Sequence, residues 1–367
     1  MEYNIGSSRN RNPEQCVNEV TARFKNPKLI IFFSPVEGFE EYTTLIHNRF
    51  PNSICMGATT IAAFSKDGAD KQGMKAMSFE SGITCAADVI EDVDKYPIKY
   101  VERVKRCADK VKNTKNTICL EFSTGLLCAE ESVLSTLNTI LLDKKIPVIG
   151  GTAGDAGTAS ETKVSLNGRV CERSTVFAII HNEHGVAKVF RENIYEPISG
   201  NILTATRVDA QTRTVYEYNH QPALQVFARE LGVTEDRVTN YFDTNPVGRI
   251  VGDEMYITAN CAVADNRGIT YHARIYENSK VVVLKPSNYR NIVEQTIHRI
   301  RGEVARPSFS IMCHCLARTL LFDSEGYLQE YAKTMGNVLG EYIGFSGYGE
   351  QTGEQHFNQT MTVAVFE

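Results

Sequence analysis

Three short segments of this sequence carry residue types that bind small polar molecules. The first is the glycine-rich loop 150–157, which directly follows an apolar run ending at Ile149. A loop of this composition exposes backbone N–H groups that can hold an anion. Its glycine spacing does not fit a dinucleotide fingerprint, and it lacks the Gly-Lys-Ser/Thr of a phosphate-binding P-loop. The loop therefore indicates either a ligand contact or a tight structural turn, because glycine serves both purposes.

The second segment, residues 310–318, contains two cysteines, a histidine and an arginine. If it is a strand, its side chains alternate between faces, so His314 lies opposite Cys313 and Cys315. This alternation argues against a single Cys-His-Cys metal site. A thiol close to Arg318 can act as a nucleophile, because a nearby cation favours the thiolate. The alternative is two buried thiols and an arginine in a surface ion pair.

The third segment, residues 344–360, combines glycines with polar side chains. A nucleophile elbow needs a glycine two residues on either side of its serine, and Tyr348 stands at the second of these positions after Ser346. The serine-hydrolase interpretation is therefore excluded. What remains is a loop that orients a polar ligand by hydrogen bonds, or a turn whose polar residues face water. The candidate ligand-binding side chains of this segment are Ser346, Glu350, Gln351 and Asn358.

Three of the eight histidines lie in or near predicted strands of the second half of the chain, namely His272, His314 and His356. Each can ligate haem iron through an imidazole nitrogen, or can form ordinary hydrogen bonds. The Cys-x-x-Cys-His motif of covalent haem attachment is absent from the sequence.

Composition and charge exclude several classes of protein. The 367 residues are 42% hydrophobic and 23% charged, which is typical of a globular protein, and the length suggests about two domains. No run approaches the roughly 18 apolar residues of a membrane-spanning helix, and residues 1–11 are too polar for a secretory signal. The net charge of −5 gives no basic field for nucleic acid. The ten scattered cysteines fit buried thiols in a reducing compartment rather than a structural zinc site. We therefore expect a cytoplasmic protein that binds neither membranes nor nucleic acid.

Hydrophobic periodicity predicts alternating helices and strands in the first half of the chain. Asn12 is expected to cap a helix that has Pro13 in its first turn. Further helices are predicted at 39–50, 97–111 and 130–142, and strands at 29–33, 53–57, 118–122, 146–149 and 186–190.

Two hairpins are also predicted in the first half. Residues 75–79 and 83–90 are expected to pair through the turn between them. The dipeptide Asn167-Gly168 is a strong turn signal between the strands predicted at 163–166 and 175–180.

Periodicity fails around residues 195–200, and we place a domain boundary there. The second half continues with strands at 202–208, 214–218, 255–263, 268–276, 281–284, 309–315 and 361–366, and helices after Pro222, at 289–301 and at 325–335. The pattern predicts an α/β (mixed α+β) protein of two domains, 1–198 and 199–367. Each domain is expected to hold a mixed or largely antiparallel sheet flanked by helices.

The motifs in this order resemble those of the FIST family, in a tandem of a FIST N and a FIST C domain. The resemblance covers nearly the whole chain, and the combination of the 150–155 loop with the closing motif is its most specific part. The matching segments are Ile54–Thr59, Pro147–Asp155, Ser174–Ala178, Gln221–Leu224, Asn245–Gly248, Cys315-x-x-Arg318, Gly344–Gln351 and Asn358–Thr360.

The resemblance implies a module that senses small ligands, with amino acids as one proposal, and that accompanies kinases, chemoreceptors or cyclic-dinucleotide enzymes. One subfamily is similar to haem proteins that sense nitric oxide, and eukaryotic relatives carry an F-box. We expect the output of this chain to come from a separate partner, such as a histidine kinase or a cyclic-dinucleotide enzyme, because the length leaves no room for an output domain.

We therefore expect a non-enzymatic cytoplasmic sensor, without a cofactor, whose loops converge on a pocket for a small polar metabolite such as an amino acid. Two alternatives stay open: a haem-binding nitric oxide sensor using His272, His314 or His356, and an enzyme with Cys315 as nucleophile. The expected ligand-binding residues are Gly151, Thr152, Asp155, Cys315, Arg318, Ser346, Glu350, Gln351 and Asn358.

Overall fold

The computed structural model describes residues 2–367 and confirms a mixed fold of helices and sheets. By its internal contacts the chain forms two compact units. The first holds the chain up to Arg191 and the segments 297–354 and 361–367, and the second holds 192–296 and 355–360. The predicted division into 1–198 and 199–367 was placed where hydrophobic periodicity fails. In the division by contacts, the C-terminal segments 297–354 and 361–367 belong to the first unit.

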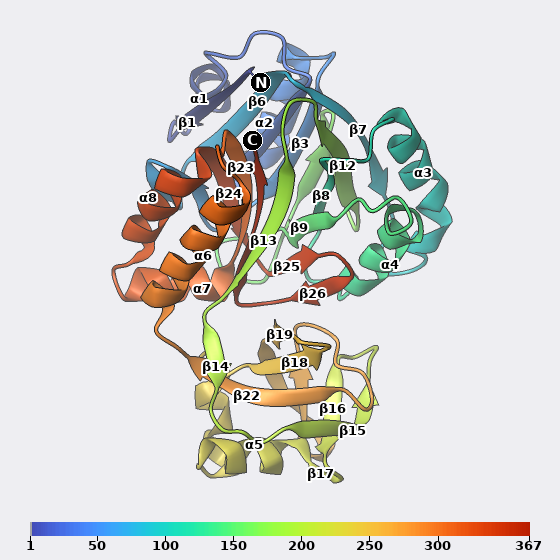
Figure 1. The fold of residues 1–367 in the computed structure, drawn as a ribbon, viewed down its shortest axis with the longest axis vertical. Coiled ribbons are helices and arrows are strands. Elements are labelled where there is room, and N and C mark those ends of the chain that lie inside the picture. The colour runs from blue at the N-terminus through green and yellow to red at the C-terminus, as the bar shows by residue number, and fades with distance from the viewer. Residues whose placement is uncertain (1) are drawn as a thin grey trace. The chain divides into compact units, whose positions relative to one another are not determined.

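The first unit contains three sheets (Figure 1). The first sheet has the order β1 (Glu2–Ser8), β6 (Met74–Ser81), β2 (Leu29–Ser34), β3 (Ile54–Thr59), β10 (Val164–Leu166) and β11 (Arg169–Cys171). The second runs β25 (Gly349–Thr352), β9 (Val148–Thr152), β8 (Thr117–Ser123), β12 (Thr175–Asn182) and β7 (Ile83–Ile90). The third runs β13 (Ala187–Asn193), β27 (Thr360–Phe366), β23 (Phe309–Cys315), β24 (Glu341–Gly347), β4 (Ala63–Ser65) and β5 (Gly68–Asp70).

Each of these sheets contains a parallel pair of strands, and a helix connects the pair because parallel neighbours need a crossover. The pairs are β2 with β3, β8 with β9, and β23 with β24. The crossover helices are α2 (Phe39–Arg49), α4 (Glu130–Leu141), and the two helices α7 (Leu316–Ser324) and α8 (Leu328–Leu339). The other helices of this unit are α1 (Pro13–Val20), η1 (Pro97–Tyr100) and α3 (Val101–Lys110).

One hydrophobic core joins the three sheets. The Phe33 ring of β2 stacks on Phe345 of β24 at 4.9 Å between centroids, and meets the edge of Phe122 of β8 at 5.3 Å. All three rings are fully buried. Offset-stacked and edge-to-face contacts of this kind are favourable, so this trio fixes one strand of each sheet against the other two.

The second unit is built on an antiparallel sheet with the order β19 (Glu254–Thr258), β18 (Val247–Val251), β22 (Lys280–Pro286), β15 (Leu203–Asp209), β16 (Thr214–Tyr218), β21 (Gly268–Tyr271) and β20 (Asn260–Ala264). Strand β14 (Tyr195–Pro197) pairs with β22, and β17 (Gln221–Pro222) pairs with β16. Helix α5 (Ala223–Leu231) packs on this sheet and forms the hydrophobic core of the unit with it. Inside this core, the hydroxyls of Tyr218 and Tyr271 are hydrogen-bonded to each other. The remaining elements are η2 (Glu235–Tyr241), η3 (Asp265–Arg267), β26 (Gln355–Phe357) and α6 (Tyr289–Glu303). The division between the two units falls inside α6.

Most predicted elements are confirmed within a few residues, including the cap of α1, where the Asn12 side chain accepts a hydrogen bond from the Gln15 N–H. The predicted hairpin of 75–79 with 83–90 is wrong. Strand β6 is already paired on both edges, with β1 and β2, so β7 pairs with β12 in another sheet. Gly82, at φ +82°, lets the chain turn between the two sheets.

The Asn167-Gly168 turn is confirmed, with positive φ at both residues. Its second strand is β11 rather than the predicted 175–180, because β12 is held between β7 and β8. Helix α7 was not predicted, and the helix predicted at 325–335 is α8, at Leu328–Leu339.

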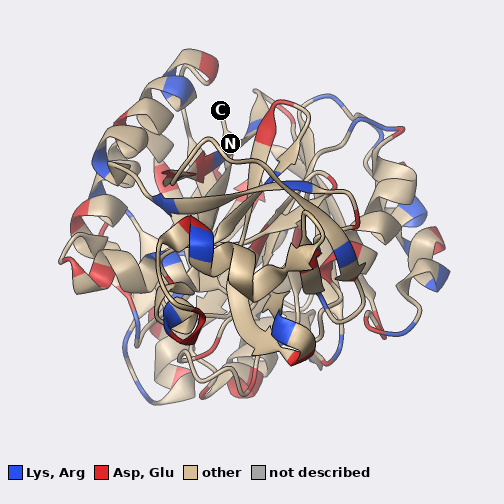
Figure 2. Cartoon of the chain, turned by 90° about the horizontal axis from the view of Figure 1, so that it is seen from below, with Lys and Arg blue, Asp and Glu red and all other residues tan. Residues whose placement is uncertain are grey.

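Charged residues of both signs are interspersed over the ribbon (Figure 2). Among the described residues, no helix is long and apolar enough to cross a bilayer.

Candidate functional site

The carboxyl ends of parallel strands from all three sheets of the first unit meet at one place. The N–H of Gly154, just beyond β9, donates to the Thr59 carbonyl at the end of β3, at 2.9 Å. The N–H of Tyr348, just beyond β24, donates to the carbonyl of Thr152 at 3.0 Å. Ligands of open α/β sheets bind in crevices outside such strand ends. The strand ends of three sheets therefore meet at one candidate site.

Glycine is required where these strand ends touch. A Cβ on Gly347 would lie 1.9 Å from the Thr152 carbonyl oxygen, and one on Gly154 would lie 2.8 Å from the Ser346 carbonyl oxygen. No other residue type permits such an approach without moving the backbone. These glycines of the two predicted loops thus have a structural task, which is to bring the loops together.

Asp155 organises the loop that follows β9. Its carboxylate is buried, and the Tyr348 hydroxyl donates to Oδ1 at 2.5 Å. Burial disfavours the charged form, but the hydrogen bonds from Tyr348 and the backbone outweigh it and hold the pKa of Asp155 well below its usual range. The carboxylate is therefore engaged within the protein. It accepts backbone N–H groups from Gly157, Thr158, Ala159, Ser160 and Glu161 at 2.8 to 3.3 Å.

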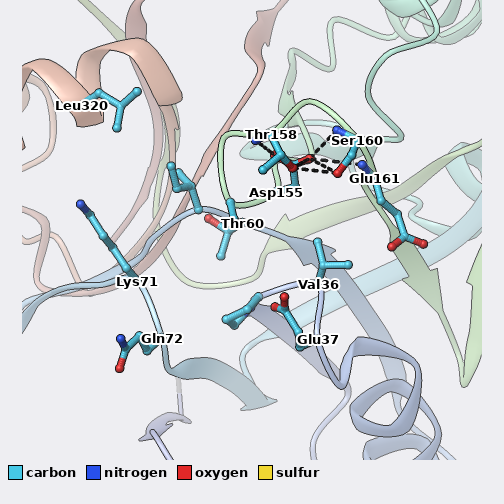
Figure 3. Close-up of a pocket in the computed structure, with 13 residues that line it drawn as sticks. Val36, Glu37, Thr60, Lys71, Gln72, Asp155, Thr158, Ser160, Glu161 and Leu320 are labelled. Carbon is cyan, nitrogen blue, oxygen red and sulfur yellow. Dashed lines mark hydrogen bonds between the residues drawn. The ribbon is translucent and has the colours of Figure 1, made fainter.

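A cavity of about 470 Å³ opens beside this loop (Figure 3). Its walls come from residues that follow four strands, with Pro35–Glu37 after β2, Thr60 and Ile61 after β3, the Asp155 loop after β9, and Leu320 of α7 after β23. Lys71 and Gln72, from the turn between β5 and β6, complete the lining, and Figure 3 shows them across the cavity from the Asp155 loop. The volume suits a small molecule.

The lining of this cavity offers charges of both signs. The Lys71 Nζ lies 2.6 Å from the Asp323 carboxylate in an exposed pair, which a ligand carboxylate can replace at little cost. The Glu37 carboxylate has no hydrogen bond or ion pair within residues 2–367. Leu320 adds an apolar surface and is 45% exposed. The cavity can therefore hold a molecule that carries both an ammonium and a carboxylate group.

Two of the predicted site residues, Thr152 and Gln351, touch each other. The Gln351 Nε2 donates to the Thr152 Oγ1 at 3.0 Å, and that hydroxyl donates to Glu130 Oε1 at 3.2 Å. All three side chains are buried. Glu130, at the start of α4, was not predicted from the sequence.

Two further predicted residues, Gly151 and Glu350, stand opposite each other in the ladder of β9 and β25. Next to them Glu121 of β8 is fully buried and accepts a hydrogen bond from the Ser123 hydroxyl at 2.8 Å. Burial, reinforced by nearby Glu130, raises the pKa of Glu121 to about 8. Glu121 was also missed, because an acid inside an apolar strand gives no signal of its partners.

Ser346 is the end of a buried hydrogen-bonded chain. Its hydroxyl contacts the Thr319 hydroxyl at 2.7 Å, which contacts the Nδ1 of His314 at 2.8 Å. Thr319 also donates to the carbonyl of Cys315 at 3.0 Å. Burial, followed by the nearby cation of Arg318, lowers the pKa of His314 well below its ordinary value. The imidazole is thus neutral.

Arg318 is fully buried, so the alternative of a surface ion pair is wrong. Its guanidinium carbon lies 4.9 Å from the centroid of the Phe322 ring and 5.3 Å from that of Tyr331. Such cation–π contacts offset part of the cost of burying the charge. The other part of that alternative, two buried thiols, is confirmed, because Cys313 and Cys315 are nearly inaccessible to solvent.

The other predicted residues lie in the second unit. Asn358 accepts a hydrogen bond from the backbone N–H of Ala259 at 3.2 Å. The Nε2 of His356 contacts the carbonyl oxygen of His272, whose own side chain is exposed. These side chains are therefore assigned to a different unit from the cavity.

The surroundings of His314 do not fit a haem. Its ring is buried, with the rings of Phe64, Tyr331 and Phe322 at 5.2, 5.3 and 5.8 Å between centroids, where a porphyrin needs open space. His356 uses its Nε2 in a hydrogen bond. Residues 2–367 contain no group of three or more His, Cys, Asp or Glu placed to hold a metal ion.

The chain matches two models of known protein families. The FIST N domain matches residues 28–221, and the FIST C domain matches residues 223–352. An uncharacterized protein of Methanocaldococcus jannaschii is 22% identical over 393 residues, covering 95% of this chain and 75% of that protein. The solved structure of PurLQS from Thermotoga maritima aligns at 12% identity over 99% of this chain and 72% of that one. Its TM-score of 0.19 does not indicate a shared fold.

Proposed function

Since the chain belongs to the FIST family, we propose that it senses a small zwitterionic metabolite, such as an amino acid, and signals through a separate protein partner. FIST domains are small-ligand-sensing signal-transduction domains and are not typically enzymes. The family resemblance suggests a histidine kinase or a cyclic-dinucleotide enzyme as the partner.

The observation that carries the proposal is the cavity at the carboxyl ends of the parallel strands. Its lining includes the cation of Lys71, the unengaged carboxylate of Glu37 and the exposed apolar side chain of Leu320. A ligand carboxylate would replace Asp323 as the partner of Lys71, and a ligand ammonium would pair with Glu37. Such an arrangement of a few polar groups around an apolar wall orients a ligand.

The alternative enzyme, with Cys315 as nucleophile, would need a different site, because Cys315 does not line this cavity. The residues around the cavity include neither cysteine nor histidine, so no thiolate or imidazole faces a bound molecule there. Asp155, whose carboxylate is engaged by its own loop, would serve to shape the wall. In this proposal a bound ligand shifts the population of conformations that the partner recognises.

A thermal-shift screen of the purified protein against the common amino acids tests the proposal. A ligand at about 100 times its Kd is expected to stabilise the folded protein by about 2.7 kcal/mol. Lys71→Ala and Glu37→Gln should each weaken this response at least tenfold in ligand concentration. Lys105→Ala is the matched control, because Lys105 forms a similar exposed pair with Asp109 away from the cavity.

Two outcomes would argue against the proposal. One is the absence of a shift with every amino acid at millimolar concentration. The other is a shift that Lys71→Ala and Lys105→Ala reduce equally, which would place the ligand elsewhere in the protein.

A further inference from the structure

A second cavity adjoins the first. It has a volume of about 420 Å³ and shares four lining residues with the cavity described above: Pro35, Glu37, Lys71 and Gln72. Because these residues line both spaces, the two cavities lie side by side, and we call them together the trough. Glu37 and Lys71 line both of its halves. A free amino acid would fill only part of a trough of this size.

The second cavity is lined by two arginines that the first lacks. Arg9 is engaged, with its Nε 2.7 Å from the Asp70 carboxylate. The exposed guanidinium of Arg11 has no hydrogen bond or ion pair within the described chain, residues 2–367. A ligand anion can therefore bind Arg11 without breaking an existing interaction. Arginine also matches the planar geometry of carboxylate and phosphate.

The two ends of the trough differ in charge. Beyond the shared Glu37 and Lys71, the first cavity adds two carboxylates, Asp155, which is engaged by its own loop, and Glu161, which pairs with Lys163 at 3.0 Å. The second cavity adds the two arginines. A ligand with an ammonium at one end and an acid at the other would lie along this gradient in one direction. The opposite direction would place its acid beside Glu161 and its ammonium beside Arg11.

We propose that the sensed ligand is a dipeptide-sized molecule with an amino-acid head and an acidic tail, and that Arg11 binds the tail in the second cavity. This inference rests on the proposed function, because it extends the same site. The tail is a carboxylate or a phosphate, since both present oxygens that a guanidinium can bind in pairs.

Isothermal titration calorimetry with matched probes tests the inference. γ-Glutamylglycine and its C-terminal amide share an amino-acid head and differ only in the charge of the tail, and phosphoserine and serine test a phosphate. The acidic member of at least one pair is expected to bind about fivefold or more tightly than its neutral partner. In Arg11→Ala the two members should bind equally, at the affinity of the neutral one, and Arg11→Lys should restore part of the difference.

Arg23→Ala is the matched control, because Arg23 is an exposed arginine near the end of α1 and does not line the trough. It should leave the preference for the acidic tail unchanged. Far-ultraviolet circular dichroism checks that each variant is folded. We expect folding to be unaffected, because the side chains of Arg11 and Arg23 are exposed.

The outcomes separate the two proposals. If amino acids bind and depend on Lys71, but acidic and neutral probes bind equally to the unmodified protein, the proposed function stands and the acidic-tail inference is wrong. A preference for the acidic tail that survives Arg11→Ala also overturns the inference, because another cation would be responsible. If none of the amino acids or probes binds, both proposals fail.

Discussion

Glu121 is a carboxylic acid enclosed by protein, with a pKa of about 8. It therefore keeps its proton in the folded state at pH values where the unfolded chain has lost it. A folded state that binds an extra proton loses stability as pH rises. Between about pH 4.5 and 8 the contribution of Glu121 should fall by roughly 1.4 kcal/mol per pH unit.

Glu121→Gln tests this expectation, because the amide cannot ionise. The free energy of unfolding in urea, measured at pH 5 and pH 8, should fall less with pH in the variant than in the unmodified protein. The free energy of unfolding of the variant, minus that of the unmodified protein, should therefore be more positive at pH 8 than at pH 5. An identical difference at both pH values would mean that Glu121 titrates like an exposed acid.

Of the ligand-binding residues predicted from the sequence, Asp155 lines the cavity, and the other predicted residues do not. Thr152 and Gln351 lie in glycine-containing segments, and their contact follows from the close approach that those glycines permit. Arg318 was expected to meet an anionic group of the ligand, and the structure places it fully buried with its guanidinium against two aromatic rings. Lys71 carried no signal at all, because its relevance depends on a turn that folds beside strands distant in sequence.

At the scale of elements, the Asp155 loop is held by its own side chain. Five backbone N–H groups and the Tyr348 hydroxyl donate to one carboxylate, so the loop needs no regular secondary structure to be ordered. An asparagine would keep one acceptor oxygen and lose the charge that strengthens these bonds.

Asp155→Asn is therefore expected to loosen residues 156–161 and to cost about 2 kcal/mol of stability, in the range for charged hydrogen bonds. Hydrogen exchange of the Gly157 and Ser160 amides should accelerate, and Tm should fall. The matched control is Asp209→Asn, because Asp209 accepts backbone N–H groups from Gln211 and Thr212 in an exposed turn. Unchanged exchange at Gly157 and Ser160 would contradict the role assigned to Asp155.

Local signals predicted single elements well and their pairing poorly. The cap at Asn12 and the Asn167-Gly168 turn depend on neighbours within a few residues, and both are present. The hairpin expected from 75–79 and 83–90 failed because both edges of β6 were taken by β1 and β2. Which strand pairs with β6 is decided by segments that are distant in the sequence. A local sequence pattern therefore cannot predict the pairing.

At the scale of the whole chain, stability of the first unit depends on contacts between its sheets. Phe345 packs against one ring from each of the other two sheets, Phe33 and Phe122. Phe345→Ala should lower the free energy of unfolding by about 3 to 5 kcal/mol, the range for large cavities in cores. Leu142→Ala is the control, since Leu142 is 58% exposed and should change stability by less than about 0.5 kcal/mol. Chemical denaturation of both variants measures the difference, and equal effects would contradict a shared core.

The position of β27 in the third sheet has a consequence for the order in which the protein is made. This strand, residues 360–366, lies between β13 and β23, and so it fills the interior of a sheet rather than its edge. On the ribosome, β13 emerges more than 160 residues before its neighbour exists. Until β27 arrives, the facing edges of both strands expose unpaired backbone groups, which are templates for pairing with other chains. The third sheet can therefore close only after translation has passed residue 366, and the time before that is when these edges are open to other chains.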